Sequence, residues 1–142
     1  MAGYRQWKLM NDCGIDNSDI NNQTYRYNKI LQLTKQVMTD NKNVTIMMDD
    51  NIDTLNDYTT IDRCRNLKLK EMRDNFLIDN SLTCLNDQPT FFRRGMKSCI
   101  DHVYTNTPQY TSNVTTHNLN ILSGINSLSD HSILSFTYKQ DD

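Results

Sequence analysis

Two stretches of the chain carry apolar side chains at helical spacing, with charged residues largely on the opposite side. The first runs from about residue 22 to 39 and contains Tyr25, Ile30, Leu31, Leu33, Val37 and Met38. The second runs from about residue 63 to 78 and contains Leu67, Met72, Phe76 and Leu77. This periodicity predicts two amphipathic helices, each of which buries one face.

A short apolar run between the two helices predicts a buried strand. Residues 44–48 read Val-Thr-Ile-Met-Met, in which two of the four apolar side chains are β-branched, and no helical pattern continues the run. Such a run favours a strand that is covered on both faces. Because a helix, a short turn and a buried strand follow one another here, the sequence indicates an α/β fold.

The second half of the chain predicts shorter strands. A hairpin is expected over residues 90–98, in which Gly95 supplies the positive φ of the turn. Residues 107–118 are rich in Thr and Asn and are predicted to be mainly loop. Four more segments have strand-like apolar patterns: residues 81–86, 100–104, 119–122 and 133–138. No repeat or linker interrupts the pattern, so we expect a single domain over residues 1–142.

Composition and charge narrow the choice of partners. The hydrophobic content of 37% and the mean hydropathy of -0.70 are low for a compact enzyme, but the periodic apolar segments argue against general disorder. The net charge of -2 provides no overall basic field, so a phosphate-bearing substrate must be held by local contacts and metal. The densest basic spot is Arg93-Arg94 with Lys97, which is either such a contact or a solvated hairpin tip.

The cysteines and the lengths of the apolar runs indicate the cellular compartment in which the protein is expected. The four cysteines include no Cys-x-x-Cys pair, so zinc ligation and redox chemistry are poorly supported and reduced thiols in an intracellular protein are expected. The first fifteen residues contain charges and no apolar core, so no signal peptide is visible. Because no run approaches the length of a membrane span, we expect no membrane partner.

Acidic residues gather where three of the predicted strands end or begin. Asp49, Asp50 and Asn51 follow residues 44–48 directly, while Asp101-His102 and Asp130-His131 lie at two later strand ends. An EF-hand loop is excluded, because its sixth and twelfth positions hold Thr54 and Thr60 instead of Gly and Glu. An imidazole oriented by a carboxylate can act as a general base, and neighbouring carboxylates can hold Mg²⁺. The alternative for any single Asp-His dipeptide is a capped turn.

Four segments resemble the endonuclease/exonuclease/phosphatase family, in the order and spacing of that family. Val-Thr-Ile-Met-Met-Asp-Asp-Asn at 44–51 resembles its apolar strand followed by Gly-Asp-Phe-Asn. Ser98-Cys-Ile-Asp-His-Val-Tyr resembles its Ser-x-Ile-Asp-His-Ile strand, and Ser129-Asp-His resembles its closing motif. Tyr4-Arg5 before Trp7, and the 89–95 hairpin, are similar to endonuclease domains of non-LTR retrotransposon reverse transcriptase polyproteins.

The resemblance implies a fold, a reaction and a role for each matched residue. The fold would be a four-layer α/β sandwich (DNase I-like), and the reaction would be Mg²⁺-dependent (or Mn²⁺-dependent) hydrolysis of a DNA phosphodiester. The implied catalytic roles are these: Asp49 orients the attacking water, Asn51 holds a phosphate oxygen, Asp101 orients His131, His131 acts as base or stabilises the pentacovalent phosphate, and Tyr4 contacts phosphate. Asp130, with Asp49, would lie at the metal. DNA as partner makes the nucleus one candidate compartment.

The sequence also departs from the family. Met48 and Asp50 stand where the family has Gly and Phe, and a carboxylate at position 50 is expected to alter the electrostatics at the metal. The family has roughly a hundred residues before the Tyr-Arg segment, including its metal-binding Glu, so the resemblance implies that this chain would correspond to the C-terminal portion of an N-terminally truncated domain. We therefore expect weak or absent activity for these residues alone. The alternatives are a non-catalytic remnant or binding protein, or a phosphatase of the same family that acts on a small phosphorylated substrate.

Overall fold

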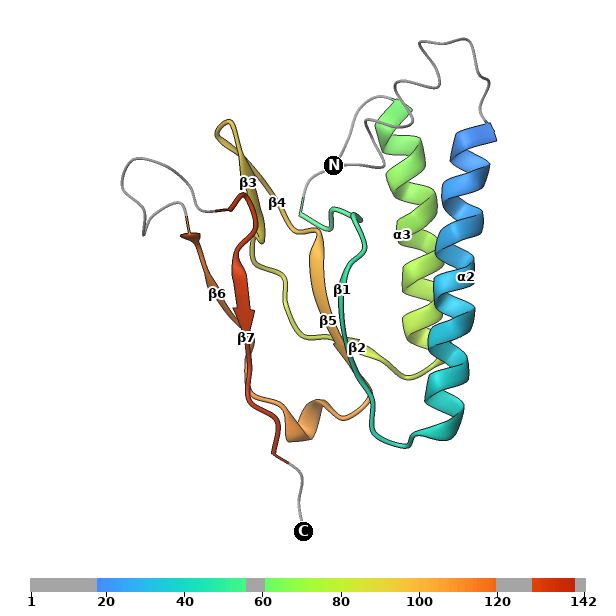
Figure 1. Ribbon diagram of the computed structural model, residues 1–142, viewed down its shortest axis with the longest axis vertical. Helices are drawn as coiled ribbons and strands as arrows, with labels where there is room; N and C mark the ends of the chain where they lie inside the picture. The colour runs from blue at the N-terminus through green and yellow to red at the C-terminus, as the bar shows by residue number, and fades with distance from the viewer. Residues whose placement is uncertain (1–17, 56–60, 120–128, 140–142) are drawn as a thin grey trace.

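The computed structural model describes residues 18–55, 61–119 and 129–139 of the 142-residue chain. Two long helices, α2 (Ser18–Asp40) and α3 (Ile61–Asp79), lie against each other and cover one face of a small sheet (Figure 1). Both helices were predicted from the apolar spacing, and both are confirmed to within a few residues. No described helix combines the length and the apolar character that crossing a membrane requires.

The central sheet has three antiparallel strands in the order β1-β5-β2. These are β1 (Thr45–Asp49), β5 (Asp101–Thr105) and β2 (Thr83–Cys84), all close to the predicted segments. The register of β1 and β5 places Asp49 opposite Asp101 and Thr45 opposite Thr105. Asp49 and Asp101, which are 52 positions apart in the chain, are thereby set side by side.

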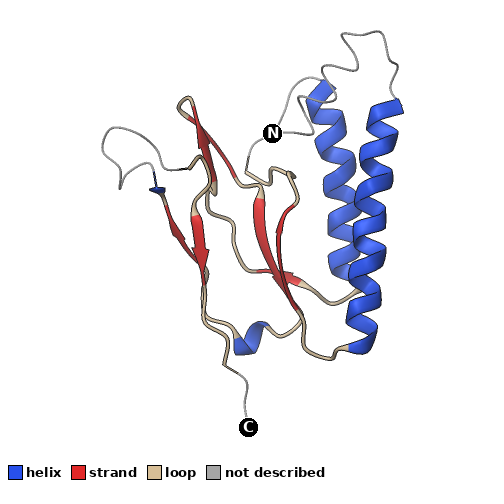
Figure 2. Cartoon of the chain, viewed as in Figure 1, coloured by secondary structure: helices blue, strands red, loops and turns tan. Residues whose placement is uncertain are grey.

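Two further antiparallel pairs lie on the side of the sheet away from the helices, as Figure 2 shows in red. The predicted hairpin is formed by β3 (Phe91–Arg93) and β4 (Met96–Ser98). Its two turn residues, Arg94 and Gly95, have φ values of 50° and 77°, the combination that a two-residue type I′ turn requires. The other pair joins β6 (Thr115–His117) to β7 (Ile133–Ser135).

The described chain is a mixture of helices and antiparallel sheets, which agrees with the predicted α/β character at this level. The prediction that residues 107–118 are mainly loop was partly wrong, because they contain the 3-10 helix η1 (Pro108–Tyr110) and β6. The residues of β6 form a strand because they pair with β7. A pairing partner so distant in the chain cannot be recognised from the spacing of residues in the sequence. The weak strand predicted over 119–122 lies almost wholly outside the described residues.

The core between the helices and the sheet is built on Tyr27, Leu31, Ile52 and Leu69, with Met48, Met72 and Phe76 packed against it. The prediction that β1 is covered on both faces was wrong. Ile46 and Met48 face the helices, whereas Met47 on the other face is 70% exposed. The reason is that β1 is an edge strand of a sheet that has helices on one side only.

Candidate functional site

Three of the predicted site residues meet at one end of the β1–β5 pair. Asp49 is the last residue of β1 and Asp101 is the first residue of β5, so the antiparallel register sets them opposite each other. His131 joins them from the segment that precedes β7, and one ligand atom from each of the three residues lies within 4.8 Å of the others. We call Asp49, Asp101 and His131 the carboxylate–histidine cluster.

His131 is held in this cluster by its carboxylate partner and by the hairpin. Its Nδ1 atom lies 2.9 Å from Oδ2 of Asp101, so the ring donates Nδ1–H to the carboxylate. The Phe91 ring packs edge-on against the imidazole at a centroid distance of 4.9 Å, and the two residues also form a backbone bridge. The Asp101–His131 pairing expected from the resemblance is therefore present, and Nε2 is the ring nitrogen not engaged with Asp101.

Thr90 connects two of the three segments that build the cluster. It is completely buried, and its hydroxyl oxygen accepts hydrogen bonds from the N–H groups of Ile100 and Asp101, each at 3.1 Å. Its carbonyl accepts a 2.7 Å hydrogen bond from the N–H of Ser132. One residue thus fixes the start of β5 and the segment that carries His131.

The electrostatics of the cluster favour a positive ligand. Desolvation and the negative charge of Asp101 raise the pKa of Asp49, although the nearby His131 and a hydrogen bond from the N–H of Asn51 act in the opposite direction. The two carboxylates therefore repel each other at neutral pH. A cation between them would relieve this repulsion.

The remaining predicted site residues are placed differently. Asn51 follows the strand with a left-handed φ of 59°, a conformation that Asn tolerates, and its N–H points back to Asp49. Asp130 is exposed, and among the described residues it is not part of the carboxylate–histidine cluster. Instead it lines an open pocket of about 380 Å³ with the β3–β4 hairpin. Tyr4 lies outside the described residues.

The Asp50 side chain lies on the other side of the strand from the cluster, although its charge still helps to raise the pKa of Asp49. The Asp50 side chain is fully buried, and Oδ1 accepts a 2.9 Å hydrogen bond from Nδ1 of His102. Oδ2 accepts a short hydrogen bond from the Tyr104 hydroxyl. Successive side chains of a strand point to opposite faces. The side chains of Asp49 and Asp50 therefore lie on opposite sides of the sheet.

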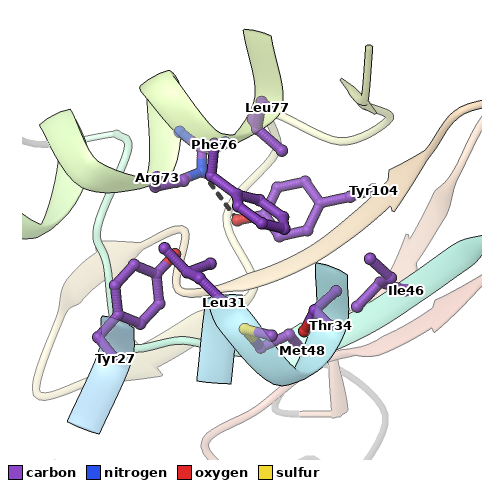
Figure 3. Close-up of a pocket in the computed structure, with 9 residues that line it drawn as sticks. All are labelled: Tyr27, Leu31, Thr34, Ile46, Met48, Arg73, Phe76, Leu77 and Tyr104. Carbon is purple, nitrogen blue, oxygen red and sulfur yellow. Dashed lines mark hydrogen bonds between the residues drawn. The ribbon is translucent and has the colours of Figure 1, made fainter. Parts of the chain in front are cut away.

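The buried partners of Asp50 extend to helix α3. Figure 3 shows the Arg73 side chain reaching from the helix to the hydroxyl of Tyr104, a contact of 2.8 Å between Nε and the oxygen. The two side chains line a small internal pocket of about 10 Å³ between the helices and the sheet, enough space for about one water molecule. We call Asp50, His102, Tyr104 and Arg73 the inner network. Sequence reasoning missed it, although strict alternation along β1 and β5 would have separated Asp50 and His102 from Asp49 and Asp101.

The inner network is charged at neutral pH. Burial lowers the pKa of His102, but the hydrogen bonds to Asp50 and Cys99 and the charge of Asp50 outweigh it and raise this pKa to about 9. The imidazolium donates Nδ1–H to Asp50 and directs Nε2 at Thr54 Oγ1, 3.2 Å away, and at Cys99 Sγ, 3.6 Å away. His102 is thus a buried cation with a carboxylate partner.

A pH dependence of stability follows from this raised pKa. Because His102 binds its proton more tightly in the folded state, its contribution is complete below pH 6.5 and is lost as the pH rises through about 9. We expect the free energy of unfolding of the wild type to fall by about 3 kcal/mol between pH 6.5 and 9.5 through this group. Denaturant titrations at each pH measure it. In His102→Gln most of this pH dependence of the free energy of unfolding should disappear. In His117→Gln, which changes an exposed histidine, it should remain.

Asp53, the last carboxylate of the acidic run, supports the loop and does not reach the cluster. It is 2% exposed, and its Oδ1 accepts hydrogen bonds from the N–H groups of Leu55 at 2.9 Å and Cys99 at 3.0 Å. The N–H of Thr54 in turn donates to the carbonyl of Cys99 at 3.1 Å. The loop after β1 is therefore tied to the residues just before β5.

Comparisons of this chain with family models, with characterised proteins and with solved structures found no match.

Proposed function

We propose that this chain is part of an endonuclease/exonuclease/phosphatase-type domain in which the carboxylate–histidine cluster supports metal-dependent hydrolysis of a DNA phosphodiester. The observation that carries the proposal is the convergence of Asp49, Asp101 and His131. They come from three separate segments, in the chain order that the resemblance requires. Asp101 also makes the contact with His131 that the proposed mechanism needs.

The geometry suits His131 as a general base or as a stabiliser of negative charge. Asp101 holds the ring through Nδ1, which leaves Nε2 directed away from this bond for proton transfer or for contact with a phosphate oxygen. Asp49 is exposed at the end of β1, where its carboxylate can orient a water molecule. Asn51 follows it and would hold a phosphate oxygen through its side-chain amide.

A divalent cation fits the donor set of the cluster. Carboxylate oxygens are ligands that Mg²⁺ and Mn²⁺ accept, and an imidazole suits Mn²⁺ better than Mg²⁺. The raised pKa of Asp49 marks the place where a positive charge is favoured. Asp49 and Asp101 would hold the ion, which would supply charge stabilisation at the phosphate when bound. Asp130, the other predicted ligand, could contribute only through a change in its position or through water.

DNA is the substrate class because the basic hairpin lies next to the cluster. Arg93, Arg94 and Lys97 surround the open pocket of about 380 Å³, and Phe91 of the same hairpin contacts His131. Local cations of this kind can hold phosphates even though the net charge is -2. The family fold, a four-layer sandwich, would place a second sheet over the exposed Met47 face. An intracellular, nuclear location belongs to the same proposal.

The main alternative is a binding protein without catalysis. The position of Asp130 outside the cluster favours it. For this reason we expect only slow cleavage by the 142 residues alone.

Metal binding and nicking by the Asp49→Ala variant test the proposal. We expect the wild type to bind Mn²⁺ and to nick supercoiled DNA slowly with Mg²⁺, and Asp49→Ala to bind Mn²⁺ at least about tenfold more weakly. Calorimetry measures the affinity for Mn²⁺, and a plasmid assay measures the rate of nicking. Hydrolysis of p-nitrophenyl phosphate tests activity on a small phosphorylated substrate. Asp87→Ala, at an exposed Asp away from the cluster, should match the wild type.

Three outcomes would change the conclusion. No Mn²⁺ binding, with nicking no faster than for Asp49→Ala, would contradict the hydrolase and support the binding protein. Robust cleavage abolished by Asp49→Ala would refute weak activity but not the hydrolase. Hydrolysis of p-nitrophenyl phosphate without nicking would point to a phosphatase.

A further inference from the structure

The inner network lies directly behind the carboxylate–histidine cluster, on the other face of the same two strands. Asp49 and Asp50 are consecutive in the chain, as are Asp101 and His102. Asp49 and Asp101 oppose each other in the strand register, while Asp50 and His102 bond to each other on the helix side. The ends of β1 and β5 are therefore connected on both faces of the sheet, by the carboxylate–histidine cluster on one face and by the inner network on the other.

Both carboxylate oxygens of Asp50 are occupied. Oδ1 accepts from His102 at 2.9 Å and from the N–H of Ile52 at 3.3 Å, and Oδ2 accepts from the Tyr104 hydroxyl. The Tyr104 hydroxyl also accepts from Arg73, so α3 takes part in holding Asp50. Because the side chain of Asp50 is fully buried, these bonds leave it little freedom to move.

The loop that carries Asn51 is fixed from both ends by these contacts. The N–H of Ile52, the residue after Asn51, donates a 3.3 Å hydrogen bond to the Asp50 carboxylate. Two residues further on, Thr54 Oγ1 lies 3.2 Å from Nε2 of His102. His102 thus contacts the loop at two points, and Asp50 is the point closest to the cluster.

Stability alone is a poor explanation for a buried ion pair at this position. Removing two charges from water costs several kcal/mol per ion, and apolar residues of similar volume often serve as well or better. What such a pair supplies is a unique geometry, because any displacement leaves a buried charge or hydroxyl without its partner. Here the fixed geometry is the separation of two strand ends that each carry a site carboxylate.

We propose that Asp50 is a positioning residue: it clamps the end of β1 to β5 through His102 and Tyr104 and thereby sets the geometry of Asp49, Asp101 and His131. The proposal rests on the proposed function for its consequence in metal binding. Its structural part does not, because it concerns the Asp101–His131 hydrogen bond, which is a contact between two side chains of this chain.

The test compares wild type with Asp50→Asn, which keeps the volume and removes the charge, and with Tyr104→Phe, which removes one hydrogen bond to Asp50. Thr45→Val is the matched control, since it removes the 3.0 Å Thr45–Thr105 hydrogen bond at the far end of the same strand pair. Circular dichroism checks that each variant is folded. Nitrogen-15 NMR of His131 in metal-free protein, at one pH, reports whether Nδ1 carries the proton. Calorimetry gives the Mn²⁺ dissociation constant.

We expect the wild type and Thr45→Val to show a His131 ring with the proton fixed on Nδ1. In Asp50→Asn this signal should become an average of two tautomers, and the Mn²⁺ dissociation constant should rise about 10- to 100-fold. Tyr104→Phe should show the same change to a smaller extent, roughly threefold in the dissociation constant. A general loss of stability would not produce this pattern, because Thr45→Val disturbs the same two strands.

A folded Asp50→Asn variant with an unchanged His131 signal would overturn the proposal. So would a His131 signal that changes as much in the control Thr45→Val as in Asp50→Asn. If Asp50→Asn does not fold, Tyr104→Phe decides, and an unchanged His131 signal in that variant is the contrary result. If no variant and not even the wild type binds Mn²⁺, the proposed function fails. The His131 signal still decides the positioning role in that case.

Discussion

Replacing His131 with alanine is expected to reduce metal-dependent nicking of DNA by at least about 100-fold, with the protein still folded. His131 supplies the imidazole of the cluster, the side chain suited to general acid–base catalysis, and Asp101 orients it through a 2.9 Å hydrogen bond. Its side chain is 40% exposed, so truncation leaves a small surface defect and little change in the core. Single-turnover nicking of a supercoiled plasmid, at high protein concentration, measures the slow reaction.

His117→Ala is the matched control for this experiment. His117 is an exposed histidine of β6 whose Nε2 lies 3.0 Å from Ser135 Oγ, and it is not part of the cluster. We expect this variant to nick as fast as the wild type. Equal rates for wild type and His131→Ala would show that the observed cleavage does not come from this site.

Replacing Ile52 with alanine is expected to lower the free energy of unfolding by about 2–5 kcal/mol. Ile52 is completely buried and lies one residue after Asn51, where it inserts the loop into the core formed by Tyr27, Leu31 and Leu69. Truncation would leave a cavity among side chains from two helices, which cannot close over it without moving. Urea unfolding followed by circular dichroism gives the difference.

Ile133→Ala offers the comparison, because it makes the same chemical change on β7 at a side chain that is 53% exposed. Its effect should stay within about 0.5 kcal/mol. If Ile52→Ala were no worse than Ile133→Ala, the loop after β1 would not be packed as the structure shows. Asn51 and Asp49 would then lack the support that the site requires.

The elements that sequence reasoning predicted well are those with strong local signals. Both helices follow from apolar spacing, and the β3–β4 hairpin follows from Gly95, whose φ of 77° is costly for most other residues. The meeting of Asp49, Asp101 and His131 was predicted from the order of motifs along the chain. It is present in the structure, although the chemistry assigned to it remains a proposal.

The buried face of α2 was not predictable from apolar spacing. Tyr27 and Leu31 face the core, while Ile30, Leu33 and Val37 from the predicted apolar set are between 45% and 62% exposed. The helix carries apolar side chains around more than half of its circumference, so a 3.6-residue period fits several faces. Only the position of the sheet and of α3 decides which face is buried.

Asp50 shows a different limit of sequence reasoning. Its position beside Asp49 suggested an additional charge near the metal, but gave no indication that the side chain is buried on the other side of the strand. In a strand, neighbouring residues are on opposite faces, and its partner His102 lies 52 positions away in the chain. Long-range pairing of this kind leaves no local pattern in a single sequence.

The connection through Thr90 has a consequence for the order of folding. Helices and hairpins form from local contacts on the order of microseconds, whereas contacts between distant segments must first overcome the entropy of closing a long loop. Thr90 and Ser132 lie 42 positions apart in the chain, and the partners in β1 and β5 lie 52 to 60 positions apart, so both sets of contacts are expected to form after the helices and the hairpin. We therefore expect the three residues of the cluster to assemble late, which makes the cluster a reporter of complete folding.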